Sequence, residues 1–274
     1  MKADDSGADD ECHSPRQAVF DDAVELGAER LTSTIPATSI SAFIAGFYVS
    51  VGALVSVAVE AAIFSATGSE DLSWLFAAFF YPLGFIFVVL GRSDLVTENF
   101  LHPSLAVWSR RGSYRQLLSL WTFGLVFNLL GVAVSILGVK ATGFVEENTV
   151  LGARMIQWLT IESELFLEHS WWTMVGRAVW AGLLINFMSW LLVTCKDNWS
   201  RIAVIWLTTF PIMLLETHHS IVGSAEVLLA MLHGAEVSFF QWLGWYLAPV
   251  AVGNTIGGVV FVAGLYYLQN ALRE

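Results

Sequence analysis

The chain has 274 residues, of which 56% are hydrophobic and only 14% are charged, with a net charge of −11. A soluble domain usually carries about a quarter charged residues, so this composition excludes an ordinary soluble protein and predicts an all-α, multi-pass membrane protein. Much of the acid lies in residues 1–30, and such a stretch would repel the phosphates of nucleic acid. No nucleic acid is therefore expected among the partners.

Residues 1–35 are expected to form an acidic, solvated cytoplasmic tail. Within it, Val19 to Leu31 predicts a short amphipathic helix lying along the membrane surface. The first 30 residues contain no apolar stretch typical of a signal peptide. Cys12 and Cys195 show no CxxC or Cys/His spacing, so neither a disulfide framework nor a metal site is expected.

Residues 36–270 are expected to form the transmembrane domain. A helix that crosses the hydrocarbon core needs about 20 apolar residues, and six candidate spans occur. The predicted spans are Ile40 to Ser65, Leu72 to Trp108, Leu117 to Val139, Trp171 to Cys195, Ile202 to Leu232 and Phe239 to Leu268.

The second and fifth predicted spans are both interrupted. Gly91 to Thr97 interrupts the second, and Thr217-His218-His219-Ser220 interrupts the fifth. Ala45-Gly46 and Asn128 to Gly131 in the first half resemble Ala181-Gly182 and Asn254 to Gly257 in the second. Because each half holds three spans, the second copy must enter from the other side. The sequence thus predicts an inverted 3+3 repeat with a transport site where the two breaks meet.

Lysine and arginine residues indicate the orientation. They are concentrated before the first predicted span, between the second and third, between the fourth and fifth, and after the sixth. Cytoplasmic loops carry an excess of these residues. We therefore expect a multi-pass protein of the cell (inner) membrane, in contact with lipid, with both termini cytoplasmic.

At the breaks the sequence resembles the formate/nitrite transporter family. Its first-break signature is similar to Leu95-Val96-Thr97-Glu98-Asn99, and its second-break signature is similar to His219-Ser220-Ile221. Its sixth helix resembles Gly253-Asn254-Thr255-Ile256-Gly257-Gly258, and its fourth helix resembles the pairing of Gly182 with Asn186. These motifs occur in the family's order between about Ala45 and Tyr267.

The resemblance implies an aquaporin-like protomer with broken second and fifth helices, assembled as a homopentamer with one pore in each protomer. It also implies that the pore passes small monovalent anions or their conjugate acids, such as formate or nitrite, without a cofactor. The sequence departs from the family pattern at three places. His218 replaces an acidic residue, Val96 replaces a phenylalanine of the constriction, and Glu168-His169-Ser170 replaces a segment that often holds lysine.

The central pair of the expected site is Thr97 and His219, which we predict to face each other and to hold a small oxyanion. Histidine changes charge near neutral pH, so His219 could link transport to protons, although the proton could equally come from water. Leu95 and Val96 are expected at the constriction, and Asn186 near the pore. His218 is predicted either to line the pore or to bond a neighbouring carbonyl.

Arg92 is costly within a membrane, and two roles are open for it. It could attract anions, or it could pair with Asp94 or Glu98 and hold the first break rigid, which is the favoured interpretation. The expected support of the breaks comes from carboxamides and close helix contacts. These supporting residues are Asn99, Asn128, Asn254 and Gly257.

The main alternative class is a membrane enzyme or metal-binding protein that uses His218 and His219 together with Glu216. Adjacent histidine side chains diverge on a helix, and the chain lacks phosphate-binding and catalytic motifs such as HExxH and GxSxG. The sequence therefore favours a transporter, not an enzyme, without bound metal. It leaves open the choice between a channel and a proton-coupled transporter.

Overall fold

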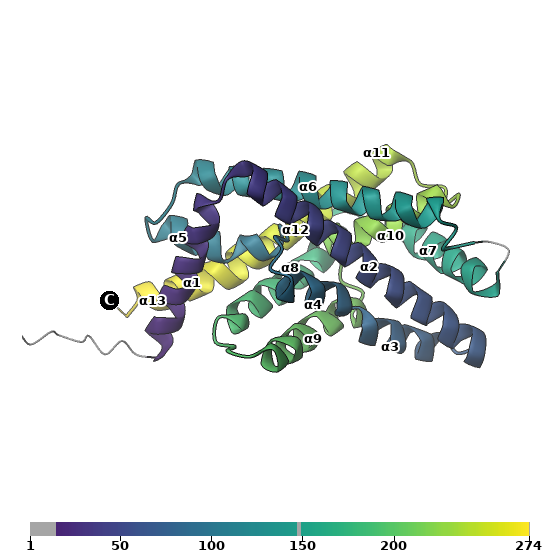
Figure 1. Ribbon diagram of the computed structural model, residues 1–274, viewed down its shortest axis with the longest axis horizontal. Coiled ribbons are helices and arrows are strands. Elements are labelled where there is room, and N and C mark those ends of the chain that lie inside the picture. The colour runs from purple at the N-terminus through teal and green to yellow at the C-terminus, as the bar shows by residue number, and fades with distance from the viewer. Residues whose placement is uncertain (1–14, 147–148, 274) are drawn as a thin grey trace, which may run out of the picture.

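The computed structural model describes residues 15–146 and 149–273, and within these ranges all regular secondary structure is helical (Figure 1). Most of the acidic tail, with Cys12, lies outside the described residues. The first half forms α1 (Pro15–Thr32), α2 (Ile35–Thr67), α3 (Glu70–Phe80), α4 (Leu83–Leu90), the 3-10 turn η1 (Glu98–Phe100), α5 (His102–Trp108) and α6 (Tyr114–Ala141). The second half forms α7 (Val150–Glu168), α8 (Trp171–Leu192), α9 (Asn198–Leu214), α10 (Ser220–Leu232), α11 (Phe239–Gln241), the π-helical η2 (Trp242–Leu247), α12 (Ala248–Thr255), the π-helical η3 (Ile256–Gly264) and α13 (Leu265–Ala271).

Five helical segments in the described part of the chain are long and apolar enough to cross a membrane. The predicted fifth span instead consists of α9, with 17 residues, and α10, with 13 residues. At a rise of 1.5 Å per residue these helices are about 26 Å and about 20 Å long, so a full crossing of the ~30 Å core needs both. The five crossing segments are Ile35–Thr67, Glu70–Leu90, Tyr114–Ala141, Trp171–Leu192 and Phe239–Ala271.

The long helix α6 shows how the sequence suits a lipid environment. Its exposed face carries Val126, Leu130, Val134 and Leu137, all between 46% and 55% exposed. Its buried face includes small or polar residues, among them Asn128, beside larger apolar ones. Because lipid solvates apolar side chains, membrane helices associate through small residues and hydrogen bonds instead of through large apolar faces.

Two glycines let the helices of each half approach closely. A Cβ atom at Gly46 of α2 would overlap the backbone oxygen of Asn128 in α6, and one at Gly182 of α8 would overlap that of Asn254 in α12. The two contacts join corresponding helices of the two predicted repeats. They place each asparagine beside the break that it supports.

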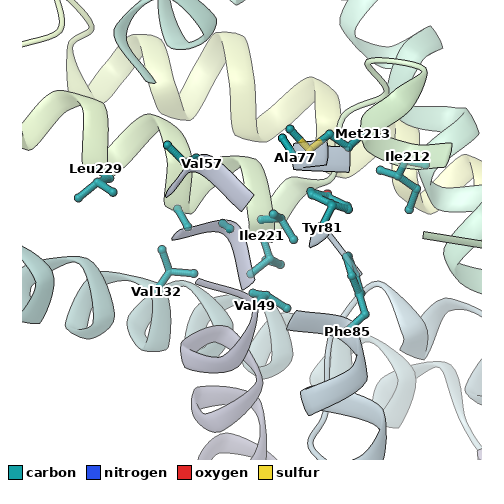
Figure 2. Close-up of a cluster of buried hydrophobic side chains, with 14 of the residues drawn as sticks. Val49, Val57, Ala77, Tyr81, Phe85, Val132, Ile212, Met213, Ile221 and Leu229 are labelled. Carbon is teal, nitrogen blue, oxygen red and sulfur yellow. The ribbon is translucent and has the colours of Figure 1, made fainter. Parts of the chain in front are cut away.

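A cluster of buried apolar side chains joins both halves around the breaks (Figure 2). Val49 of α2 and Phe85 of α4 meet Ile221, which follows the second break. Such close packing fixes the positions of the helix ends, because packed interiors resist small displacements. The cluster also draws residues from α3, α6 and α9, among them Ala77, Val132 and Ile212.

The helix α7 was not predicted, because the sequence suggested only a long loop between the third and fourth spans. It is attached to α2 by a buried ion pair in which Arg154 donates to Glu60 at 2.5 Å. Ser73 also donates to the Glu60 carboxylate, at 3.1 Å, and the Arg154 guanidinium lies 3.7 Å from the centre of the Phe64 ring. These contacts explain two charged residues that the apolar pattern left without a role.

The predicted amphipathic helix is present as α1, but its apolar face contacts protein. Phe20, Ala23 and Val24 are buried in one cluster with Leu105 of α5 and with Leu101, which directly precedes this helix. This face was expected to lie on the membrane surface. In the structure α5 covers it, and α1 and α7 lie towards opposite ends of the molecule (Figure 1).

Candidate functional site

Both breaks end a helix with the same backbone device. Arg92 after α4 and Glu216 after α9 adopt left-handed conformations, with φ of 53° and 51°. The backbone N–H of the following residue then donates to the carbonyl five residues earlier. These hydrogen bonds run from Ser93 to Val88 at 3.0 Å and from Thr217 to Ile212 at 2.9 Å. This is the Schellman ending of a helix, in which the left-handed position usually holds glycine. A larger residue there costs about 1–2 kcal/mol, so both breaks carry some backbone strain.

Asn128 of α6 satisfies the backbone of the first break. Its Oδ1 accepts from the Val96 N–H at 2.9 Å, and its Nδ2 donates to the carbonyls of Asp94 at 3.0 Å and Ala42 at 2.7 Å. The side chain is fully buried. One carboxamide therefore replaces the helical partners that the broken segment lacks.

Asn254 of α12 makes the equivalent three hydrogen bonds at the second break. Its Oδ1 accepts from the Ser220 N–H, and its Nδ2 donates to the carbonyls of His218 and Ala178, each at 2.9 Å. Gly257, one turn later, lies so close to α8 that a Cβ atom there would overlap the Val179 carbonyl. The geometry accords with the supporting roles that we predicted for both residues.

His219 is the N-cap residue of α10, and its two ring nitrogens have different partners. Nδ1 accepts from the backbone N–H of Val222 at 3.2 Å, and Nε2 lies 2.8 Å from Oγ1 of Thr97. A backbone amide can only donate, so Nδ1 carries no proton and the neutral ring carries its proton on Nε2. His219 therefore donates to the Thr97 hydroxyl, and the predicted pair is in direct contact across the two breaks.

Asn186 of α8 holds the backbone of Thr97. Its Nδ2 donates to the Thr97 carbonyl at 3.0 Å and to the Gly182 carbonyl at 2.8 Å. Its Oδ1 is buried without a hydrogen-bond partner among the described residues. Asn186 thus lies beside the central pair, as predicted, and part of its hydrogen-bonding capacity is unused.

The two predicted constriction residues are buried, and Val96 packs against α6. Leu95 is 0% exposed and Val96 is 3% exposed, and the Val96 side chain lies beside Gly124. An aromatic residue that we did not predict reaches the central pair, because the Phe85 ring meets His219 edge-on with centroids 5.3 Å apart. The surroundings of His219 are therefore largely apolar.

The favoured role of Arg92 is wrong. No hydrogen bond or ion pair joins it to Asp94 or Glu98 in the described part of the chain. Its side chain is exposed because its left-handed backbone directs it out of the packed break. Asn99 is itself held by neighbours, since Arg30 of α1 donates to its Oδ1 and Trp121 donates to its carbonyl.

Two cavities lie on opposite sides of the central pair. The α7-side cavity, about 280 Å³, is lined by residues of α7, α8, α9 and α10 and reaches His219. The α1-side cavity, about 430 Å³, contains Arg92, Glu98 next to Thr97, and Ser189. Arg177 and Ser189 lie on the same helix, one in each cavity, and twelve residues of helix span about 18 Å. The two cavities are therefore stacked along the helix axes with Thr97 and His219 between them.

His218 lines the α7-side cavity, which is one of the two positions that we predicted for it. Its ring packs edge-on against Tyr246, with centroids 5.9 Å apart, and its Nε2 has no hydrogen-bond partner among the described residues. No group of three or more His, Cys, Asp or Glu side chains in the described ranges could hold a metal ion. The metal-binding interpretation of His218 and His219 thus has no geometric support.

Most of the sequence matches one family, which decides its membership. Residues 17–268 match the profile described as formate/nitrite transporter. The chain belongs to the formate/nitrite transporter family. It is therefore a membrane protein of a transporter family, as the motifs at the breaks indicated.

Several known proteins are similar to this chain over most of their length. A probable formate transporter of Methanothermobacter thermautotrophicus is 27% identical over 242 residues, covering 83% of this chain and 86% of the relative. The formate channel BtFdhC of Bacillus thuringiensis is 25% identical over 260 residues, covering 93% of this chain and 95% of the relative. An uncharacterized transporter, YrhG, of Bacillus subtilis (strain 168) is 26% identical over 252 residues, covering 90% of each chain.

Two solved structures share the fold. A structure described as an FNT family ion channel aligns with a TM-score of 0.80 at 16% identity, covering 92% of this chain and 98% of that one. A pentameric formate channel with formate bound aligns with a TM-score of 0.70 at 18% identity, covering 94% and 100%. At these identities the similarity establishes the fold.

Several residues around the central pair were missed by the sequence reasoning. Phe85 looked like one more apolar residue of a span, and α7, with Glu162, looked like a loop. Glu226 offered a signal, because a carboxylate seven residues after His219 in an apolar half-helix faces the same side of that helix. Intramembrane carboxylates of this kind usually mark a pathway.

Proposed function

We propose that this chain is a pore for small monovalent weak-acid anions such as formate or nitrite, and that Thr97 and His219 form its transport site. The observation that supports this most directly is the 2.8 Å hydrogen bond between Thr97 and His219, which lies between two cavities. A pathway for a small ion needs a short barrier with a solvated approach on each side. The paired breaks provide that arrangement.

The proposed architecture has six crossings in an aquaporin-like inverted 3+3 repeat, with α9 and α10 together forming the fifth. The matching Schellman endings and the matching roles of Asn128 and Asn254 support the repeat. Both termini would be cytoplasmic in the cell membrane, so that the α1-side cavity opens to the cytoplasm. The pentameric relative with bound formate supports a homopentamer with one pathway in each protomer.

The Thr97 hydroxyl would be the group that recognises the substrate. Its oxygen accepts the proton of His219 Nε2, so its own hydrogen remains free to be donated. No other hydrogen bond of this hydroxyl occurs among the described residues. A substrate that loses water at the apolar barrier can replace part of its hydration with this donor, and a buried polar group left without a partner costs about 1–3 kcal/mol.

The geometry favours a fixed, neutral His219 over a titrating one. Protonation of Nδ1 would displace the Val222 N–H and leave this buried donor at the start of α10 without its cap. We therefore propose that the substrate anion takes its proton from hydronium in a cavity, giving the neutral acid and water. The neutral acid then crosses the barrier and returns the proton to water on the other side.

Flux in proteoliposomes tests the proposed function. We expect formate to enter vesicles that contain the purified protein at least tenfold faster than protein-free vesicles, and an inward proton gradient to accelerate this entry. A proton gradient without effect would favour a simple anion channel over the proton-linked pathway. If formate, nitrite, acetate, lactate and hydrosulfide all entered no faster than into protein-free vesicles, the proposed function would be wrong.

A His219→Gln variant separates a fixed donor from a titrating group. The Gln amide can present an N–H near the position of Nε2, but it cannot titrate. We expect formate flux to fall roughly 3- to 10-fold, because the cap and the donor geometry are less favourable, while the ratio of flux at pH 5.5 to flux at pH 8 stays as in the wild type. A ratio that collapses towards one would show that His219 supplies the proton, and His218→Gln serves as the neighbouring control.

A further inference from the structure

The α7-side cavity is lined by an unusual number of carboxylates for the entrance of an anion pore. Arg177 is the arginine among its lining residues, and it already pairs with Glu216 at 3.5 Å. Tyr81 and Tyr246 also line the cavity, and Glu60, which pairs with Arg154, is near enough to act electrostatically on Glu162. The titratable and charged groups that line the cavity are Glu162, His169, Arg177, Glu216, His218 and Glu226.

Two of these carboxyl groups have no partner that would compensate their charge when they ionise. Neither Glu162 of α7 nor Glu226 of α10 forms a hydrogen bond or ion pair with any residue in the described ranges. Glu226 is partly exposed to the cavity, and Glu162 remains in contact with solvent. They come from different helices and line the same cavity as His219, so an ion that enters this cavity meets the field of both.

An independent observation indicates that the cavity takes a polar occupant. The Ser163 hydroxyl lines it, is 2% exposed, and has no hydrogen-bond partner among the described residues. Buried hydroxyls are rarely left without a partner. The cavity also reaches His219, so an occupant at this place lies on the proposed pathway.

We infer that Glu162 and Glu226 act as a charge filter that admits the neutral conjugate acid and rejects its anion at the α7-side entrance. The inference rests on the proposed function, because it concerns the form in which the substrate of that pathway enters. At a separation of about 8 Å, one carboxylate lowers the local concentration of a monovalent anion roughly 3- to 30-fold, depending on whether the effective dielectric constant is near 80 or near 20. A neutral acid experiences no such repulsion.

The filter depends on pH in a definite direction. Burial, followed by the neighbouring carboxylates of Glu216 and Glu60, raises the pKa of Glu162 to about 7. Below that value Glu162 is protonated and neutral, so repulsion weakens as the pH falls. Above it the carboxylate is charged and repels anions. Acid pH therefore both supplies the neutral substrate and relaxes the filter.

The opposite entrance has a different charge distribution. Arg30, Arg92 and Arg201 line the α1-side cavity together with Glu29, Asp94 and Glu98. Because three arginines offset three carboxylates, this entrance does not repel anions selectively. The filter is thus confined to one end of the pathway.

Formate permeability of proteoliposomes at pH 5.5 and pH 8 tests the filter. For the Glu162→Gln/Glu226→Gln double variant we expect permeability at pH 8 to rise about 5- to 10-fold, and permeability at pH 5.5 to stay within about twofold of the wild type. Glu168→Gln is the matched control, because Glu168 is exposed on the same helix and does not line the cavity. It should leave both values unchanged.

The possible results distinguish a failure of the charge filter from a failure of the proposed function. A double variant that keeps the wild-type ratio between pH 5.5 and pH 8 would overturn the filter while leaving the proposed function intact. A wild-type protein without formate flux at either pH would overturn both. If loss of Glu226 prevents folding, the solvent-accessible Glu162→Lys variant alone should raise permeability at pH 8 by at least threefold, and its failure to do so would overturn the filter.

Discussion

Formate flux is expected to fall roughly 10- to 100-fold when Thr97 is replaced by valine. Valine has nearly the same shape, so the packing of the first break should persist, and the Thr97 carbonyl keeps its hydrogen bond from Asn186. The substitution removes the hydroxyl that accepts from His219 and that would donate to the substrate. A buried polar group left without its partner costs about 1–3 kcal/mol, and 1.4 kcal/mol corresponds to a factor of ten.

The matched variant is Thr97→Ser, which keeps the hydroxyl and should retain flux to within about threefold. Stopped-flow flux into proteoliposomes gives the rates, and size-exclusion chromatography confirms that each variant is assembled. Wild-type flux in a correctly assembled Thr97→Val protein would remove Thr97 from the transport site. The pathway would then have to be sought along the cavity walls.

The second large effect is expected for Asn254→Leu, which should lower the free energy of unfolding by roughly 2–5 kcal/mol. Leucine fills the space but leaves the Ser220 N–H and the carbonyls of His218 and Ala178 without their partner. Each buried group left unpaired costs about 1–3 kcal/mol. A typical interhelical hydrogen bond in a membrane is worth only about 0.6 kcal/mol. We expect Asn254→Leu to cost more, because the broken backbone has no helical partner that could replace the carboxamide.

Thermal unfolding in detergent measures this effect, with Asn198→Leu as a control at an exposed asparagine whose side chain supports no break. Asn128→Leu should have a similar effect to Asn254→Leu, since the two side chains make equivalent bonds. Asn254→Asp should be destabilised as well, because a carboxylate can accept from Ser220 but cannot donate to the two carbonyls. Equal melting temperatures for Asn254→Leu and Asn198→Leu would contradict the supporting role.

Local sequence carried much of the information about the two breaks. His218-His219 and Gly91 interrupt apolar runs that otherwise satisfy their own backbone, and such interruptions need partners inside a membrane. Asn128 and Asn254 were identified as those partners because a carboxamide both accepts and donates. The resemblance to the family, together with the hydrogen-bonding chemistry of the two side chains, then predicted that Thr97 and His219 would face each other.

Other features depended on contacts that the sequence does not encode locally. Arg92 was expected to pair with a nearby carboxylate, but the left-handed ending of α4 turns its side chain outwards. The apolar face of α1 was assigned to lipid because its pattern cannot distinguish a bilayer from the surface of α5. The helix α7 was missed because its attachment depends on Glu60, which lies 94 residues before Arg154.

The sequence by itself determined the membrane class, the family and the central pair of this protein, because apolar length, interrupted runs and motif order are all local properties. Only the tertiary structure decided which nitrogen of His219 carries the proton, since that depends on the distances to Val222 and Thr97. It also brought Glu162 and Glu226, which lie on separate helices, to one cavity. Charges that are distant in sequence act on a substrate only after folding places them beside the same path.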